Sequence, residues 1–295
     1  MLSYCISANR FLQKILLKNI YDINHTHFII PTGIVSYLNR KNIPYVITSH
    51  GSDVPGHNPD KFSFEHKLVK PLWNRIINSS RKIITPSEYL KDLIIKNANT
   101  DNIEVISNGF NSFELSPKKK EKKILLVGRL VEFKGFQYFL EAIKDIKIDY
   151  EVNIVGDGPY KEALMEKARG IEAKINFVGW LDNKSSKYKY LFERSSILVH
   201  PSSAESFGMV LLEAMSSGCA IITTNSSACA EVVGDAALLV KPENPAEIRD
   251  ALLKLINDEK LLNRMSAEAR ERVKQNFSWE GIARQYVSIY TDVIK

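Results

Sequence analysis

Cysteine is scarce in this sequence, and long hydrophobic runs are missing. Its three cysteines, Cys5, Cys219 and Cys229, show no metal-ligand spacing, and an odd number cannot all pair in disulfides. This favours a reducing, cytoplasmic compartment over a disulfide scaffold. No apolar run approaches the roughly 20 residues of a spanning helix. The N-terminus also lacks the charged-then-apolar order of a signal peptide.

Several motifs of metal, phosphate and nucleic-acid chemistry are absent as well. No Asp-x-Asp occurs, so a divalent cation held by such carboxylates is not expected, and no cofactor is predicted. No Gly-x4-Gly-Lys-Ser/Thr is present, which excludes a P-loop. His25 and His27 share a predicted strand face, but no third ligand is evident, so no metal site is predicted. No stacked-aromatic or zinc pattern supports nucleic-acid binding.

The composition is that of a soluble globular protein, and its charged residues are unevenly distributed along the chain. The 295 residues suffice for two domains, and 44% are hydrophobic and 25% charged. Residues 1–117 carry 13 Lys and Arg against 9 Asp and Glu, residues 118–123 carry 5 against 1, and residues 124–295 carry 22 against 24. The basic excess in the first part and the junction fits an acidic substrate or an anionic membrane surface. We therefore expect a cytoplasmic protein with peripheral contact to the inner face of the cell membrane.

Short apolar runs alternate with helical patterns along the chain, which predicts an α/β fold with parallel sheets covered on both faces. The predicted strands are residues 27–30, 44–48, 82–85, 103–107, 123–128, 150–156, 174–179, 197–200 and 219–224.

A polar break, SPKKKEKK (116–123), separates two such series. It is interpreted as an interdomain linker, because nine strands exceed a comfortable single sheet; a long exposed loop within one domain is the alternative. The predicted domains are residues 1–117 and 118–277, followed by a terminal helix over 278–295 with Ser278 as N-cap.

Two glutamates surround a predicted strand-to-helix turn. Glu205 follows the strand ILVH, and a helix is expected to begin near Ser206, which puts Glu213 about two turns inside it. Gly208 lets a ligand approach the backbone, and the helix start favours an anion. Because carboxylates accept hydrogen bonds from paired hydroxyls, the two glutamates are interpreted as hydroxyl clamps beside a phosphate-binding turn. The alternative is that both are solvated surface residues.

A second site candidate follows the strand KILLVG. Arg129 and Lys134 stand at its carboxyl end and at the next helix start, where two cations can neutralise a diphosphate leaving group. An ordinary basic loop is the alternative. GDGP (156–159) is a weak glycine signal that fits a turn equally well.

These segments together resemble a known family. HPSSAESFGMVLLEAMSSG (200–218) resembles the E-x7-E signature of the retaining glycosyltransferases of family 4, and VGRLVEFKG (127–135) is similar to their diphosphate motif. VGDGP, FVG and the tail from FSWE match in order and spacing. Upstream, HTHFIIPTG, IPYVITSHGSD, ITPSEYLKDLI and VISNGF resemble the second half of the family's N-terminal domain.

The resemblance implies the GT-B architecture: two Rossmann-like domains with parallel sheets and a C-terminal helix that crosses back. It also implies metal-free transfer of a sugar from a nucleotide diphosphate with net retention. The implied catalytic residues are Glu205, His50, Arg129 and Lys134. The implied donor-binding residues are Gly128, Arg129, Lys134, Glu205, Phe207, Gly208, Met209, Val210 and Glu213. In this scheme Glu205 binds the donor sugar, Glu213 binds the ribose, and His50 positions the sugar. Asp53 is expected to brace the loop that carries His50.

The front of the chain departs from the family, because only 24 residues precede the HTH-like segment and no glycine-rich loop is seen. About half of the N-terminal domain is expected to be missing. A donor-binding but catalytically incomplete subunit, or a nucleotide-sugar epimerase, are therefore alternatives. UDP-sugars are the favoured donors, GDP-mannose is next, and the acceptor is expected to be a glycan or a lipid-linked glycan.

The segment FLQKILLKNI places Phe11, Leu12, Ile15, Leu16 and Ile20 on one side of a predicted helix. Such a helix is expected to pack on its own sheet. The alternative is that it lies against a membrane surface or a partner chain.

Overall fold

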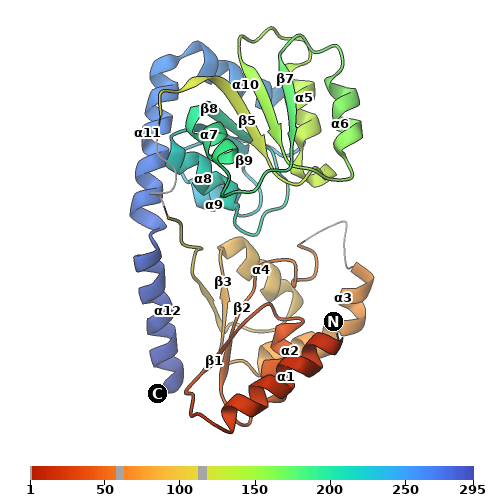
Figure 1. Cartoon of the computed structure of the whole chain (residues 1–295), viewed down its shortest axis with the longest axis vertical. Coiled ribbons are helices and arrows are strands. Elements are labelled where there is room, and N and C mark those ends of the chain that lie inside the picture. The colour runs from red at the N-terminus through yellow and green to blue at the C-terminus, as the bar shows by residue number, and fades with distance from the viewer. Residues whose placement is uncertain (1, 58–62, 112–117) are drawn as a thin grey trace. The chain divides into compact units, whose positions relative to one another are not determined.

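The structure, a computed structural model, describes residues 2–57, 63–111 and 118–295. The chain forms two compact units, one of Met1–Asn108 with Glu280–Lys295 and one of Gly109–Trp279. Each unit contains one parallel sheet with helices around it (Figure 1). The predicted α/β class with two parallel sheets is therefore confirmed. The predicted boundary at residue 117 lies outside the described residues.

The sheet of the first unit has the order β1-β2-β3-β4, and all its neighbours are parallel. Its strands are β1 (Asn24–His27), β2 (Tyr45–Thr48), β3 (Lys82–Thr85) and β4 (Ile103–Val105). The predicted first strand at 27–30 was wrong by three residues. Phe28 has a φ of 70°, which an extended strand cannot hold, so the strand ends at His27.

Helices cover both faces of this sheet because successive strand residues point to opposite sides. The helices are α1 (Leu2–Leu16), α2 (Thr32–Leu38), α3 (Ser63–Asn78), α4 (Glu88–Asn97) and α12 (Trp279–Ile294). Tyr45 and Ile47 are buried with Trp73 of α3 on one side. Val46 is buried with Ile282 of α12 on the other. The predicted return of the C-terminal helix onto the N-terminal sheet is thus confirmed.

The α1 helix is only partly covered by its own unit. Leu12, Ile15 and Leu16 are half-buried, whereas Phe11 is 65% exposed and Ile20, which follows the helix, is 97% exposed. The expectation that all five apolar residues face one covered side is wrong: Phe11 lies on the helix but is exposed, and Ile20 lies beyond the end of the helix at Leu16. Within the described residues, no helix has both the length and the apolar character needed to cross a membrane.

The sheet of the second unit has the order β10-β9-β8-β5-β6-β7. Its strands are β5 (Glu121–Val127), β6 (Glu151–Val155), β7 (Ile175–Gly179), β8 (Ser195–His200), β9 (Ala220–Thr224) and β10 (Leu238–Val240). β10 was not among the predicted strands, because its three residues are too few to show a pattern. The second half of the lysine run, from Glu121, belongs to β5, so the predicted linker over 116–123 was too long.

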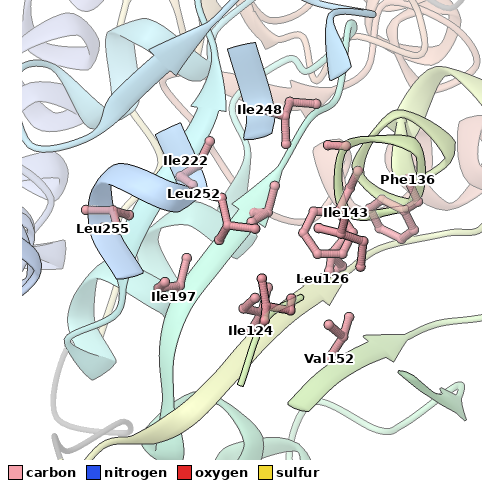
Figure 2. Close-up of a cluster of buried hydrophobic side chains, with 14 of the residues drawn as sticks. Ile124, Leu126, Phe136, Ile143, Val152, Ile197, Ile222, Ile248, Leu252 and Leu255 are labelled. Carbon is pink, nitrogen blue, oxygen red and sulfur yellow. The ribbon is translucent and has the colours of Figure 1, made fainter. Parts of the chain in front are cut away.

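Two hydrophobic clusters cover the two faces of this sheet. The helices are α5 (Phe136–Ile143), α6 (Lys161–Ala168), α7 (Ser186–Arg194), α8 (Met209–Ser217), α9 (Cys229–Val233), α10 (Pro245–Asn257) and α11 (Glu259–Asn276). Ile124 and Leu126 of β5 pack with residues of α5 and α10, as Figure 2 shows. Leu125 lies in the opposite cluster with residues of α7 and α8. Cys219 and Cys229 are free and buried. The core thus holds the strand ends of this unit in place.

Candidate functional site

A pocket of about 660 Å³ opens at the carboxyl ends of β5, β6 and β7 in the second unit. Its wall consists of Val127, Gly128, Arg129, Val155, Gly156, Asp157, Trp180, Leu181, Asp182, Asn183 and Tyr188. Loops after parallel strands converge at one edge of a sheet, which is where open α/β folds bind ligands. The pocket therefore has the expected position for a ligand site.

The loops after β5 and β6 touch each other closely in this pocket. Gly156 has a φ of 138°, and a Cβ at this position would lie 1.9 Å from the Gly128 carbonyl oxygen. The backbone N–H of Leu130 donates to the carbonyl of Asp157 at 2.9 Å. The weak GDGP signal in the sequence thus marks a real close approach of two backbones.

Lys134, Glu205 and His200 form a charged cluster beside this pocket. The Lys134 ammonium and His200 Nε2, the latter at 2.8 Å, both contact Oε1 of Glu205. The side chains of Lys134 and Glu205 are 15% and 14% exposed. The stem of Lys134 passes the Cα of Gly128, since a Cβ built there would lie 3.8 Å from its Cδ and Cε. Lys134 therefore links the Glu205 carboxylate to the wall of the pocket.

The cluster keeps Glu205 ionised although it is buried. Burial by itself raises the pKa of this carboxyl, but Lys134 and His200 outweigh burial and hold the pKa well below its usual range. Burial also lowers the pKa of His200, while its contacts with Cys229 and Glu205 raise that pKa to about 9. Near neutral pH the site therefore holds an anion between two cations.

Gly135 determines where Lys134 can lie. Lys134 ends a 3-10 turn, Glu132–Lys134, and Gly135 continues the chain into α5 with a φ of 74°. A Cβ on Gly135 would lie 2.1 Å from the carbonyl oxygen of Pro201, in the loop that leads to Glu205. The two loops are also joined by the Ser203 N–H, which donates to the Phe133 carbonyl at 2.9 Å.

The turn before α8 differs from the predicted one. The helix begins at Met209 rather than near Ser206, because Gly208 has a φ of 91° and ends the loop. Glu213 is therefore the fifth helical residue, about one turn inside rather than two. Met209 is 40% exposed and Val210 is half-buried.

Phe207, predicted as a donor contact, has its side chain in the core. It is 3% exposed and packs edge-on against Phe277 at a ring-centroid distance of 5.8 Å. Its side chain therefore holds the turn in place, and only its backbone can meet a ligand. Arg129, by contrast, is an exposed residue of the pocket wall, where its guanidinium is open to an anion.

Glu213 contacts Tyr188, which lies on α7. The Tyr188 hydroxyl donates to Oε2 of Glu213 at 2.7 Å. Burial raises the pKa of Glu213 to about 7, although the hydrogen bond from Tyr188 works in the opposite direction. Since Tyr188 also lines the pocket, the two predicted carboxylates belong to one site region: Glu205 reaches it through Lys134 and Glu213 through Tyr188.

His50 belongs to the first unit, where it follows β2. Its Nε2 lies 3.0 Å from Nδ1 of His27, and the two rings stack at 5.2 Å. Burial and His27 lower the pKa of His50, so it is neutral near pH 7. Asp53 accepts hydrogen bonds from the N–H groups of Ile29, His50 and Gly51 at 2.7–3.2 Å, as expected of a residue that braces this loop. No group of three or more potential metal ligands occurs in the described ranges.

Three residues of the site were missed in the sequence. Trp180 follows β7 and is 72% exposed at the pocket, a position that the rule of strand carboxyl ends could have indicated. His200 and Tyr188 left no signal, since they look like strand and helix core residues. The packing of α7 against α8 brings Tyr188 to Glu213, and the loop after β8 brings Glu205 back to His200.

The comparison with known families decides the class of protein. The model for "Glycosyl transferases group 1" matches residues 107–272, which include the pocket and both glutamates. The chain belongs to this family. The model for "Glycosyltransferase Family 4" matches residues 2–112 of this glycosyltransferase. The suspected family and the enzyme class are thereby confirmed.

Relatives and solved structures agree with this assignment. An uncharacterized glycosyltransferase of Methanocaldococcus jannaschii is 31% identical, over 99% of this chain and 81% of its own length. The N-acetyl-alpha-D-glucosaminyl L-malate synthase of Bacillus anthracis is 29% identical, over 99% of this chain and 80% of its own length. Sucrose-phosphate synthase from Thermosynechococcus elongatus has a TM-score of 0.82 at 21% identity, over 97% of this chain and 77% of its own. Anabaena HepE, solved with UDP and glucose, has a TM-score of 0.82 at 19% identity, over 97% of this chain and 80% of its own. The structural likenesses confirm the GT-B fold.

Proposed function

We propose that this glycosyltransferase moves a sugar from a nucleotide diphosphate to an acceptor hydroxyl with retention of anomeric configuration. The observation that carries the proposal is the Lys134–Glu205 pair beside a pocket at the strand ends. A lysine next to that pocket suits a diphosphate, and a carboxylate accepts hydrogen bonds from sugar hydroxyls. Transfer to a defined acceptor, followed by NMR of the new anomeric centre, tests retention; an inverted product would contradict it.

The expected donor is a UDP-sugar, with GDP-mannose as the second candidate. Anabaena HepE, which shares the fold, was solved with UDP and glucose. We expect the nucleoside in the pocket of Arg129 and Trp180, its ribose hydroxyls on Glu213, and its diphosphate at Lys134 and the backbone N–H groups of the α8 start. Electrostatic stabilisation of the leaving diphosphate then supplies much of the rate enhancement.

The proposed chemistry needs no dedicated base. The bond between the anomeric carbon and the leaving phosphate oxygen breaks on the face where the acceptor oxygen attacks. That phosphate oxygen takes the acceptor's proton, so atoms and charges balance. Glu205 binds donor-sugar hydroxyls and shields the positive charge at the anomeric carbon. The motif resemblance assigns His50 to the donor sugar as well, and its neutral imidazole can donate or accept a hydrogen bond there.

Donor binding is expected to be independent of a metal, because Arg129 and Lys134 supply positive charge and the sequence has no Asp-x-Asp. Calorimetric titrations with UDP and with GDP, each with and without EDTA, check this. The same dissociation constant with and without EDTA is expected for the better nucleotide. Loss of binding on chelation would contradict the metal-free site, and restoration by added Mg²⁺ or Mn²⁺ would identify the missing ion.

We further propose that the acceptor is a glycan or a lipid-linked glycan of cell-surface assembly, and that the α1 face contacts an anionic membrane. This face consists of exposed Tyr4, Ile6, Phe11, Leu17, Ile20 and Tyr21 together with exposed Arg10, Lys14 and Lys18. No acidic residue precedes Asp22 in the sequence. Its inner side is held to α2, partly by a 2.7 Å hydrogen bond between Asn39 and Asn9. Basic and apolar side chains exposed together on α1 and on the segment that follows it suit an anionic interface.

Co-sedimentation with vesicles tests the membrane contact. The chain is expected to bind vesicles rich in phosphatidylserine at low salt, and to bind neutral vesicles or high-salt samples far less. The double variant Lys14→Glu and Lys18→Glu should weaken binding roughly 30-fold, since each cation near the surface contributes about 1 kcal/mol. The control is Lys254→Glu with Lys274→Glu, which makes the same charge change on exposed residues of α10 and α11. Equal binding to both vesicle types, or equal loss of binding in both double variants, would contradict membrane contact through the α1 face.

A further inference from the structure

Tyr188 lies at the boundary between the pocket and Glu213, and it is held firmly there. Its side chain is 8% exposed, and its ring contacts Phe192 at a centroid distance of 4.9 Å. Its backbone N–H is capped by the Ser185 hydroxyl at 3.2 Å, which places it in the first turn of α7. From this position its hydroxyl donates to Oε2 of Glu213 on α8 at 2.7 Å.

We propose that Tyr188 is a positioning residue of the donor site, whose hydroxyl holds Glu213 ionised and oriented so that the carboxylate accepts the ribose hydroxyls of the bound nucleotide. This inference rests on the proposed function, in which Glu213 binds the ribose. With Oε2 fixed by Tyr188, Oε1 has no hydrogen-bond partner in the part of the chain that the structure describes. It remains available to the ligand.

The charge of Glu213 depends on its burial and on this contact with Tyr188. Glu213 lies on α8, which packs against α7, α9, α11, β8 and β9. Over the described part of the chain, Tyr188 is the single titratable group that acts on it from these elements, and no cation faces it. Burial raises the pKa of Glu213 to about 7, whereas donation from Tyr188 favours the ionised form. Without that donor the pKa rises further, and a protonated carboxyl accepts fewer hydroxyls.

The sign of the resulting pH dependence follows directly. Ribose binding needs the ionised carboxylate, so affinity for the ribose hydroxyls rises as pH rises through the pKa of Glu213. Below that pKa, affinity falls about tenfold per pH unit, because one proton must be lost on binding. In the Tyr188→Phe variant, the same rise in affinity for the ribose hydroxyls is expected at higher pH.

Calorimetry with UDP and with its 2′,3′-dideoxy analogue, from pH 5.5 to 8.5, tests this. The two nucleotides titrate alike at their phosphates, so the ratio of their affinities reports the ribose contact alone. In the wild-type protein, the preference for UDP should appear between pH 6 and 8. Tyr188→Phe should reduce that preference about tenfold at pH 7 and regain it near pH 8.5. Glu213→Gln should abolish it at every pH. GDP and its dideoxy analogue replace these probes if GDP is the nucleotide bound.

The control is Tyr190→Phe, which makes the same change on α7 at a tyrosine that is 45% exposed and lies against Lys123. It should match the wild-type protein at every pH. A preference unchanged in Tyr188→Phe but lost in Glu213→Gln would overturn the role of Tyr188 while leaving the ribose assignment intact. A wild-type protein that does not distinguish the two nucleotides would overturn the ribose assignment and, with it, this inference. A lower preference in Tyr188→Phe that high pH does not restore would mean a purely structural role and would also overturn it.

Discussion

Glu205→Gln is expected to reduce sugar transfer by about 100- to 1,000-fold while leaving UDP affinity nearly unchanged. Loss of one group that stabilises transition-state charge has an effect of this order. The glutamine keeps the shape of the side chain but removes the anion between Lys134 and His200. Lys134 stays available to the diphosphate, so nucleotide binding should not weaken. Transfer rates and UDP calorimetry on the same preparation measure the two effects.

The matched variant Glu213→Gln is expected to fail in the opposite way. Loss of a charged hydrogen-bond acceptor costs about 1.5–3 kcal/mol, which is roughly a 10- to 150-fold loss of UDP affinity. Transfer at saturating donor should fall less than in Glu205→Gln. Equal loss of UDP affinity in both variants would show that the two carboxylates do not have the separate roles assigned here. Comparing the two variants with different acceptors also separates effects on donor binding from effects on the transfer step.

Gly135→Ala is expected to cost several kcal/mol of folding stability and to displace Lys134. The new Cβ would lie 2.1 Å from the Pro201 carbonyl oxygen, a backbone atom that cannot move aside without shifting the loop that carries Glu205. Left-handed backbone itself costs a non-glycine residue only about 1–2 kcal/mol. The rest of the cost comes from this collision, and UDP affinity should fall with it. Urea unfolding and UDP calorimetry measure both.

Gly170→Ala is the control for this prediction. Gly170 has a φ of 78°, close to the 74° of Gly135, but a Cβ there meets nothing within 4 Å. Its substitution should therefore show the backbone cost alone and leave UDP binding unchanged. If the two variants lose the same stability and bind UDP equally well, the contact between the Lys134 and Glu205 loops does not hold the site together.

Much of the site region was predictable because it follows from local rules. Arg129 lies at the carboxyl end of β5 and lines the pocket, and Gly208 holds a left-handed turn directly before α8. Both features depend on a strand end and a turn, which leave patterns within a few residues. The first strand was misplaced for the same kind of local reason: the apolar run HFII looks extended, but the positive φ of Phe28 ends the strand before it.

Sequence patterns alone predict the α/β class, the two parallel sheets, the return of the C-terminal helix and the resemblance to family 4. Hydrophobic periodicity and ordered motifs survive in the one-dimensional order of residues, so these features could be read there. The tertiary structure alone decided how the carboxylates are charged. Lys134 and His200 surround Glu205, whereas Glu213 has only Tyr188, and their pKa values are driven in opposite directions. Spacing in the sequence makes the two glutamates equivalent, and only burial and partners from separate elements make them different.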